Sequence, residues 1–240
     1  MLNRPEVMNA WDLHLVYQLR DAIYMVASDE KIKVVVPEGT GGDFSSGADM
    51  FLLKEDSAAP EQLKVMKELG RFMRTLRGMP QPIIAKLRGV AVGAGANLAL
   101  ASDFVLASND AKFCEVFVNI GVIFDGGGTY FLPRLVGLAR AREIALLGDI
   151  IDGKRAASIG LIYKSVPDED LDHEVDSLAK ALSQKSLKAM ALIKEGLEGS
   201  FDMSLTEVLE WEAAHQPIMP QTKEHKEAVR SFLESRGKSI

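Results

Sequence analysis

Two loops of small residues follow predicted strands and could present backbone N–H groups to a ligand. One loop is Ser45-Ser46-Gly47-Ala48-Asp49 and the other is Gly93-Ala94-Gly95. Small side chains allow a ligand to approach the backbone closely. Ala94 also begins a predicted helix, where the first N–H groups are unpaired and favour negative charge. Two converging N–H groups form an oxyanion hole, in which one donor contributes roughly 3–4 kcal/mol in a transition state. On spacing alone, tight turns that allow close helix–strand packing remain the alternative.

A third glycine-rich turn, Asp125-Gly126-Gly127-Gly128-Thr129, carries a carboxylate. If Asp125 lies between the apolar side chains of Phe117, Ile123 and Phe124, desolvation raises its pKa toward the range of a general base. The alternative is an aspartate that caps the next helix, with the glycines as ordinary turn residues.

Residues for several other chemistries are missing. The sequence has one cysteine, Cys114, and no histidine between residues 15 and 172. These counts disfavour an intrachain disulfide, a cysteine-cluster metal site and a histidine-based triad. The run from Gly93 to Leu98 lacks the third glycine of a dinucleotide fingerprint, and no P-loop is present. We therefore expect no metal ion and no redox cofactor.

The charge balance bears on partners and location. The 240 residues carry a net charge of −6, so we expect no membrane attachment and consider nucleic acid an improbable partner. No apolar run approaches the ~20 residues that span a bilayer, and residues 1–11 lack an apolar signal region. A cytoplasmic protein is the expectation.

One predicted helix carries a basic stripe. Lys64, Lys67, Arg71 and Arg74 share one face, opposite the apolar side chains of Leu63, Met66, Leu69 and Met73. We interpret this stripe as a solvated helix face, with binding of a phosphate or another anion as the alternative.

The order of predicted elements indicates an α/β core. Short strands are predicted at 32–36, 82–87 and 104–107, and helices at 10–27, capped by Asn9, and at 61–76. Beyond residue 185 the pattern predicts only helices, at 186–198, 203–215 and 222–236. We therefore divide the chain into a core, residues 1–184, and a helical region, residues 185–240.

The order and detail of these segments resemble the crotonase (enoyl-CoA hydratase/isomerase) superfamily. The likeness covers nearly the whole chain, and its main stretches are Leu2-Asn3-Arg4-Pro5, Phe44 to Asp49, Arg88 to Gly95, Gly126-Gly127-Gly128-Thr129 and Leu132 to Gly137. The resemblance implies a spiral of ββα units with a C-terminal helical region that forms a homotrimer or a hexamer (a dimer of trimers).

The resemblance also implies an acyl-CoA thioester substrate and the stabilisation of its enolate. By motif position, the backbone N–H groups of Ala48 and Ala94 bind the thioester oxygen. The substrate-binding residues implied are Ser46, Gly47, Ala48, Asp49, Ala94 and Phe117. We interpret the Asp49 side chain as an acceptor that holds the loop rather than as an acid or base.

The positions of the two hydratase glutamates are occupied differently in this sequence. Hydratases of the family hold a water between two glutamates, and the matching positions here are Asn97 and Phe117. Asp125 remains, at a position that resembles the single acid/base of family isomerases. The segment from Phe124 to Tyr130 is most similar to the epoxyphenylacetyl-CoA isomerase branch. One base suffices for a 1,3-proton shift, because the proton taken from one carbon can be returned to another.

We therefore predict an acyl-CoA isomerase that shifts a double bond or rearranges a ring, with Asp125, Ala48 and Ala94 as its catalytic residues. The alternatives are an enoyl-CoA hydratase in which Asp125 or Glu115 activates water, and a non-catalytic acyl-CoA or RNA-binding member of the family. We interpret Glu115 as a surface or interface charge, although strand alternation with Phe117 could place it beside the pocket. The acyl group depends on how residues 51–80 fold.

Overall fold

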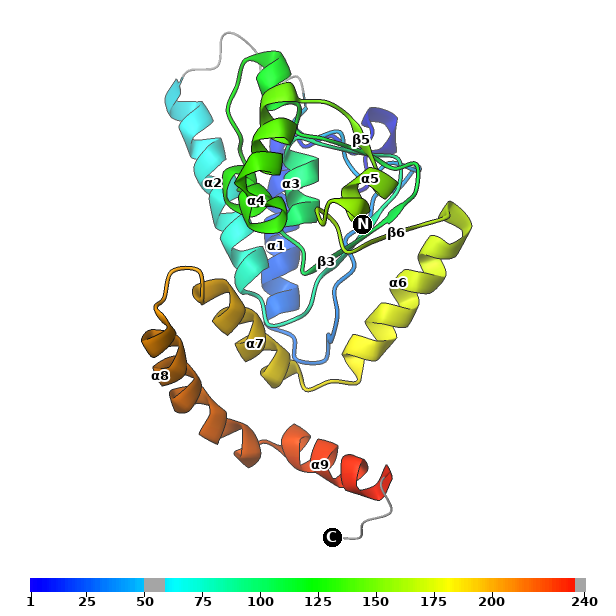
Figure 1. Cartoon of the computed structure of the whole chain (residues 1–240). Coiled ribbons are helices and arrows are strands. Elements are labelled where there is room, and N and C mark those ends of the chain that lie inside the picture. The colour runs from blue at the N-terminus through cyan, green and yellow to red at the C-terminus, as the bar shows by residue number, and fades with distance from the viewer. Residues whose placement is uncertain (50–58, 236–240) are drawn as a thin grey trace.

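The computed structural model describes residues 1–49 and 59–235 (Figure 1). In this part of the chain, strands β1 (Ile84–Leu87), β3 (Phe104–Ser108) and β6 (Lys164–Val166) form a parallel sheet in the order β1-β3-β6. Strands β2 (Val90–Val92), β4 (Lys112–Cys114) and β5 (Ile151–Asp152) form a second sheet, in which β5 is antiparallel to β4. Strands β1 to β4 thus belong to the two sheets in turn, and β5 then adds to the second sheet before β6 returns to the first.

Helices complete the repeating unit. Helix α2 (Ala59–Gly78) precedes β1 and β2, helix α3 (Ala94–Leu100) follows them, and α1 (Leu13–Ala27) packs on α2. Every residue of α3 is buried, which its small side chains allow in the space between the sheets and the neighbouring helices. The predicted α/β spiral of ββα units is confirmed, and its central helix is the one that begins at Ala94.

The N-terminal helix begins later than predicted. Helix α1 starts at Leu13 and its cap is Asp12, whose side chain accepts a hydrogen bond from the Leu15 N–H at 2.7 Å. Asn9 is instead buried in a turn with a φ of +55°. Its Nδ2 donates to the carbonyls of Thr40, at 2.9 Å, and Asp43, at 2.7 Å. The Asn9 side chain, which the local pattern predicts to cap a helix, therefore makes long-range hydrogen bonds instead.

The strand predicted at 32–36 is reduced to an isolated bridge between Val35 and Ile83. The Val35 N–H donates to the Pro82 carbonyl and the Ile84 N–H donates to the Val35 carbonyl, both at 2.9 Å. Pro37 and Pro82 have no N–H to donate, so the ladder is interrupted on both sides of this bridge. One further bond runs from the Lys86 N–H to the Pro37 carbonyl, at 3.0 Å. The segment keeps the place of a strand at the edge of the first sheet without a regular ladder.

The remaining core elements are the short helices η1 (Pro5–Val7) and η3 (Val116–Ile120) and the helices α4 (Gly128–Leu147), α5 (Gly153–Ser158) and α6 (Asp168–Ser183). Gly137, with φ 72° and ψ 161°, divides α4 into two helical pieces. Helix α6 covers the first sheet through Leu171 and Val175, which pack with Ile84, Leu106 and Val166.

The C-terminal helices leave the core one after another (Figure 1). They are α7 (Leu187–Gly199), α8 (Leu205–His215), η4 (Gln216–Gln221) and α9 (Lys223–Ser235). The first three contain no buried residue. Their exposed apolar side chains include Ile193, Leu197, Leu209 and Ile218.

Polar contacts fasten α7 to the core. The Lys194 Nζ donates to the carbonyls of Met79, at 3.2 Å, and Gln81, at 2.9 Å, and it pairs with Asp103 at 2.6 Å. Glu198 pairs with Arg77 and accepts a hydrogen bond from the Tyr130 hydroxyl at 2.7 Å. Asp103, which also accepts a hydrogen bond from the Ile83 N–H at 2.8 Å, is thus a structural residue. None of the helices in residues 1–49 and 59–235 combines the length and apolar character that a membrane span requires.

Candidate active site

The loop with Ser45 to Asp49 lies against the turn that begins α3. Ser45 is fully buried, pairs with β2 through its backbone, and its Oγ accepts a hydrogen bond from the Gly47 N–H at 3.1 Å. Gly47 has a φ of +88°, and a Cβ there would lie 2.5 Å from the Val92 carbonyl oxygen and 3.4 Å from the Ala94 nitrogen. Glycine is therefore required at 47, and the two predicted loops are neighbours.

Trp11 holds Ala48 in place. The Trp11 N–H donates to the Gly47 carbonyl at 2.7 Å, and the Asp49 N–H donates to the Trp11 carbonyl at 2.9 Å. Because the N–H groups of successive extended residues point in opposite directions, the Ala48 N–H faces away from Trp11. Within residues 1–49 and 59–235 no hydrogen bond from this N–H is found. Trp11 lies before α1 and not inside a helix, although the sequence predicted a helix from residue 10, and the sequence did not reveal this contact.

The side chains beside Ala48 bind the N-terminal segment. Asp49 pairs with Arg4 at 3.2 Å, which agrees with its interpretation as an acceptor that holds the loop. The Ser46 Oγ donates to the Val7 carbonyl at 3.2 Å. Both side chains therefore bind protein groups, and the part of this loop that can face a ligand is its backbone.

Ala94 is the first residue of α3, after Gly93 with φ 53° and ψ −120°. This conformation is essentially restricted to glycine. A Cβ at Gly95 would lie 2.6 Å from the Ser45 carbonyl oxygen, so glycine there allows α3 to approach the first loop. The Ala94 N–H donates no hydrogen bond within the described chain, as expected for the first turn of a helix.

Asn97 connects α3 to the turn that carries Asp125. It is fully buried, and its Nδ2 donates to the Asp125 carbonyl at 2.9 Å. A Cβ at Gly128 would lie 2.7 Å from the Asn97 Oδ1, so the start of α4 can approach only because residue 128 is glycine. Asn97 thus positions the backbone of Asp125, a role that the sequence did not reveal.

The Asp125 side chain does not cap α4. The cap residue is Gly127, no side chain donates or accepts there, and Gly126 and Gly127 have φ values of +56° and +94°. The Asp125 Oδ1 is buried and has no hydrogen-bond partner among the described residues. The capping alternative is therefore excluded, and the carboxyl remains available for another task.

Aromatic side chains lie beside this site. Phe117 is buried and meets Phe124 edge to face, with ring centroids 5.1 Å apart. A Cβ at Gly93 would lie 3.6 Å from the Phe117 ring, so Phe117 reaches from the Asp125 side to the turn before Ala94. Ile123, also expected beside Asp125, is 89% exposed and does not contribute to this apolar surrounding.

Glu115 is not the surface charge that the sequence suggested. It is 0% exposed, and both carboxyl oxygens are buried without a hydrogen-bond partner in the described chain. Strand alternation does not apply to it, because β4 ends at Cys114 and the chain turns into η3 at Val116. The expectation of an exposed residue was wrong, and nothing in the local pattern could have shown its burial.

The two carboxyl groups affect each other's protonation. Burial raises the pKa of Asp125 to about 6. Burial, together with the negative charge of Asp125, raises the pKa of Glu115 to about 8. Near neutral pH the pair therefore holds one proton, with Asp125 ionised and Glu115 neutral. A carboxylate with a pKa near 6 suits a general base that acts near neutral pH.

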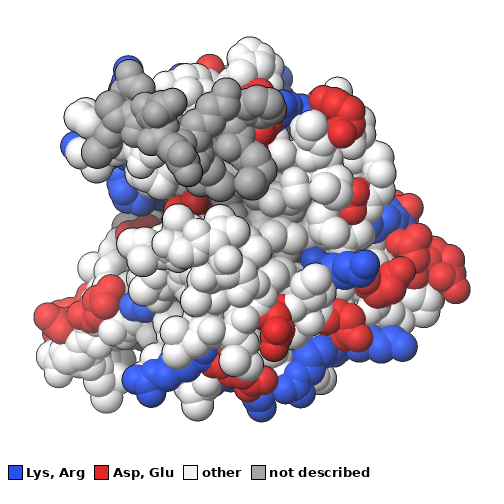
Figure 2. Space-filling model, turned by 90° about the horizontal axis from the view of Figure 1, so that it is seen from above, with Lys and Arg blue, Asp and Glu red and all other residues white. Residues whose placement is uncertain are grey.

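The surface carries two further features. The basic stripe on α2 is exposed at Lys64, Lys67, Arg71 and Arg74, whereas Leu63 and Met66, predicted to lie on an apolar face, are 54% and 45% exposed. On the face in Figure 2, basic and acidic side chains are interspersed.

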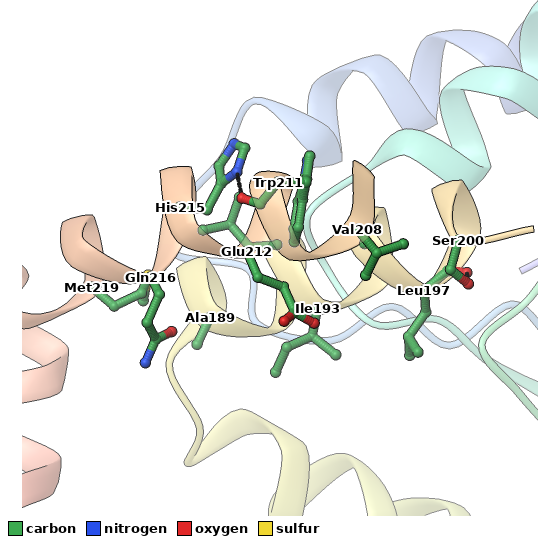
Figure 3. Close-up of a pocket in the computed structure, with 12 residues that line it drawn as sticks. Ala189, Ile193, Leu197, Ser200, Val208, Trp211, Glu212, His215, Gln216 and Met219 are labelled. Atoms are coloured by element: carbon green, nitrogen blue, oxygen red, sulfur yellow. Dashed lines mark hydrogen bonds between the residues drawn. The ribbon is translucent and has the colours of Figure 1, made fainter. Parts of the chain in front are cut away.

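An apolar groove of about 410 Å³ lies between α7 and α8, with Ile193 and Trp211 among its lining residues (Figure 3).

Comparisons with known proteins identify the family of the chain. The model of the enoyl-CoA hydratase/isomerase family matches residues 1–239. The 1,2-epoxyphenylacetyl-CoA isomerase of Escherichia coli is 34% identical, over 98% of this chain and 91% of its own length. The crotonyl-CoA hydratase of Syntrophomonas wolfei is 32% identical, over 98% and 90% of the two chains.

Solved structures show the same fold. The crystal structure of an enoyl-CoA hydratase from Bacillus anthracis superposes with a TM-score of 0.92 at 28% identity, and covers 100% of this chain and 93% of that one. The names of the relatives divide between hydratase and isomerase, so they establish the family and not the reaction. Because the family model matches residues 1–239 of this chain, the chain belongs to the enoyl-CoA hydratase/isomerase family.

Proposed function

We propose that the protein is an acyl-CoA isomerase that shifts a double bond, or rearranges a ring, in an unsaturated acyl-CoA. The observation that carries the proposal is the Asp125 carboxyl, which has an unpaired buried oxygen on a turn held by Asn97. The positions of the hydratase glutamates hold Asn97 and Phe117, neither of which can take up a proton near neutral pH.

In the proposed reaction the Asp125 carboxylate removes a proton from a carbon that the thioester activates. The C–H bond breaks, an O–H bond forms on Asp125, and the electron pair moves to the thioester oxygen as an enolate. The N–H groups of Ala48 and Ala94 stabilise that oxygen. Asp125 then returns the proton to another carbon, so the product has the composition of the substrate. No water, metal ion or redox cofactor takes part.

An assay against 2-enoyl-, 3-enoyl- and aromatic-derived CoA thioesters tests this reaction, with products separated by chromatography and weighed by mass spectrometry. We expect a product of unchanged mass from at least one thioester. A product heavier by one water, formed instead of an isomer, would contradict the proposal. The panel also addresses the acyl group, since residues 51–58 of the predicted pocket segment lie outside the described residues.

A hydratase is the second candidate, and the buried Glu115 favours it. Hydration requires two groups that orient water and transfer its protons. Glu115 and Asp125 are two carboxyl groups close enough for the charge of one to raise the pKa of the other. A water adduct as the main product in the panel would support this candidate.

We also propose that the C-terminal helices assemble the protein into a homotrimer or a hexamer. Ile193 and Leu209 are 60% and 54% exposed, and they lie on helices with no residue buried within the chain. Light scattering should give three or six times the chain mass of 26.2 kDa. Leu209→Asp should lower that mass, whereas Met25→Asp, at an exposed apolar position on α1, should not. A single-chain mass for the parent protein would refute the assembly.

A further inference from the structure

The buried carboxyl of Glu115 has no protein partner that explains its burial. Both of its oxygens lack a hydrogen bond in the described chain, although buried polar groups are nearly always paired. An unpaired ionised carboxylate in such a place is strongly unfavourable, and the group avoids the penalty by remaining protonated. This unexplained group lies within the candidate active site.

Backbone contacts tie Glu115 to the turn that presents Ala94. The Gly93 N–H donates to the Cys114 carbonyl at 2.9 Å, one residue before Glu115. Phe117, two residues after it, has its ring next to Gly93. Glu115 is therefore fixed between two contacts with the same turn, and its position is coupled to the first turn of α3.

The charged groups around Glu115 are few. Asp125, on the turn before α4, is the one charge that shifts its pKa within the described chain. The adjacent Cys114 thiol is buried, and the charges of Glu115 and Asp149 contribute to raising its pKa. Among residues 1–49 and 59–235, no lysine or arginine contributes to either shift. The surroundings thus disfavour a second negative charge beside Asp125.

We propose that Glu115 is a positioning residue for Asp125, and that it keeps the site at a single negative charge by remaining a neutral carboxylic acid while Asp125 acts as the base. This inference rests on the proposed function. If Glu115 ionised, its charge would oppose the enolate that forms on the thioester. Activity should therefore rise as Asp125 ionises near pH 6 and fall as Glu115 ionises near pH 8.

Glu115→Gln tests the proposal, because the amide keeps the shape and neutrality of the protonated acid but cannot ionise. We expect kcat at pH 7 to fall by no more than about 5-fold, because the carboxyl that the amide replaces is itself neutral at that pH. The decline of activity above pH 8 should disappear, while the rise near pH 6 should persist. A matched control, Glu210→Gln at an exposed position on α8, should keep the parental profile.

Two results would overturn the proposal. One is an alkaline decline in Glu115→Gln with the same midpoint as in the parent. The other is a loss at pH 7 as large as that of Asp125→Asn, because Glu115 would then transfer a proton itself.

Thermal unfolding without substrate tests the same protonation independently of the reaction. The pKa of Glu115 is raised in the folded state. Its favourable contribution to the free energy of unfolding is therefore fully present below its unfolded-state pKa of about 4.5, and it is lost as the pH rises through about 8. The Tm of Glu115→Gln, compared with the Tm of the parent, should therefore increase as the pH is raised from about 4.5 to about 8. A parallel pH dependence in both proteins would refute a neutral Glu115. If no acyl-CoA is isomerised but the Tm difference appears, the proposed function fails while the protonation of Glu115 stands.

Discussion

Asp125→Asn lowers kcat for isomerisation by about 10²–10⁴-fold, the contribution typical of a positioned general base. Asparagine keeps the size of the side chain but cannot accept the substrate proton. The carbonyl of residue 125, which accepts from Asn97, is unchanged by the substitution. Binding of a saturated acyl-CoA, measured by calorimetry, should therefore change little. Steady-state kinetics on the best substrate of the panel measures the loss.

Controls separate loss of the base from loss of the fold. Asp110→Asn, at an exposed position in the turn before β4, should keep parental activity. Asp125→Asn should also be more stable than the parent at pH 8, by on the order of 3 kcal/mol, because the native state holds a carboxylate whose pKa is raised to about 6. The difference should vanish below about pH 3, where the aspartate is neutral in both the folded and the unfolded state. Equal activity in the variant and the parent would remove Asp125 from the mechanism.

Ala94→Pro should lower kcat/KM by about 10²–10³-fold, because it removes one donor of the proposed oxyanion hole. A side-chain deletion cannot test a backbone donor, whereas proline replaces the N–H itself. The substitution is feasible at residue 94 because this is the first position of α3, where proline suits the helix and no intrahelical hydrogen bond is lost. Kinetics and circular dichroism at 25 °C measure activity and folding together.

Leu205→Pro is the matched control, since it places proline at the first position of α8, after the extended residue Ser204. It should keep the parental kcat/KM. An active Ala94→Pro protein would show that the Ala94 N–H does not bind the thioester oxygen. If the circular dichroism spectra of Ala94→Pro and Leu205→Pro differ, the loss of activity in Ala94→Pro would be attributed to distortion of α3.

The periodic and compositional features of the sequence predicted much of this molecule. Alternating short strands and helices predicted the α/β core, and the glycine-rich stretches predicted the turns at Gly47, Gly93 and Gly126 to Gly128. Each of these positions has a positive φ or a close contact that excludes a side chain. Such requirements are local, so residue type reveals them.

Features that depend on distant contacts were not predictable. Asn9 has the residue type of a helix cap, but carbonyls more than thirty positions away bind its side chain. Glu115 has the residue type of the surface, yet the end of β4 directs it inward. Asn97 was recognised as a replaced glutamate, while its bond to Asp125 needed the arrangement of α3 and α4. In each case tertiary structure decided against the local preference.

The contact between Asn97 and Gly128 also limits how this chain can change. Any side chain at 128 would collide with the amide, and a longer residue at 97 would be pressed against the start of α4. Restoring a glutamate at 97 alone should therefore displace the turn that holds Asp125 rather than create a water-binding pair. An evolutionary or engineered path from this site to a hydratase must move the helix before it exchanges the residue.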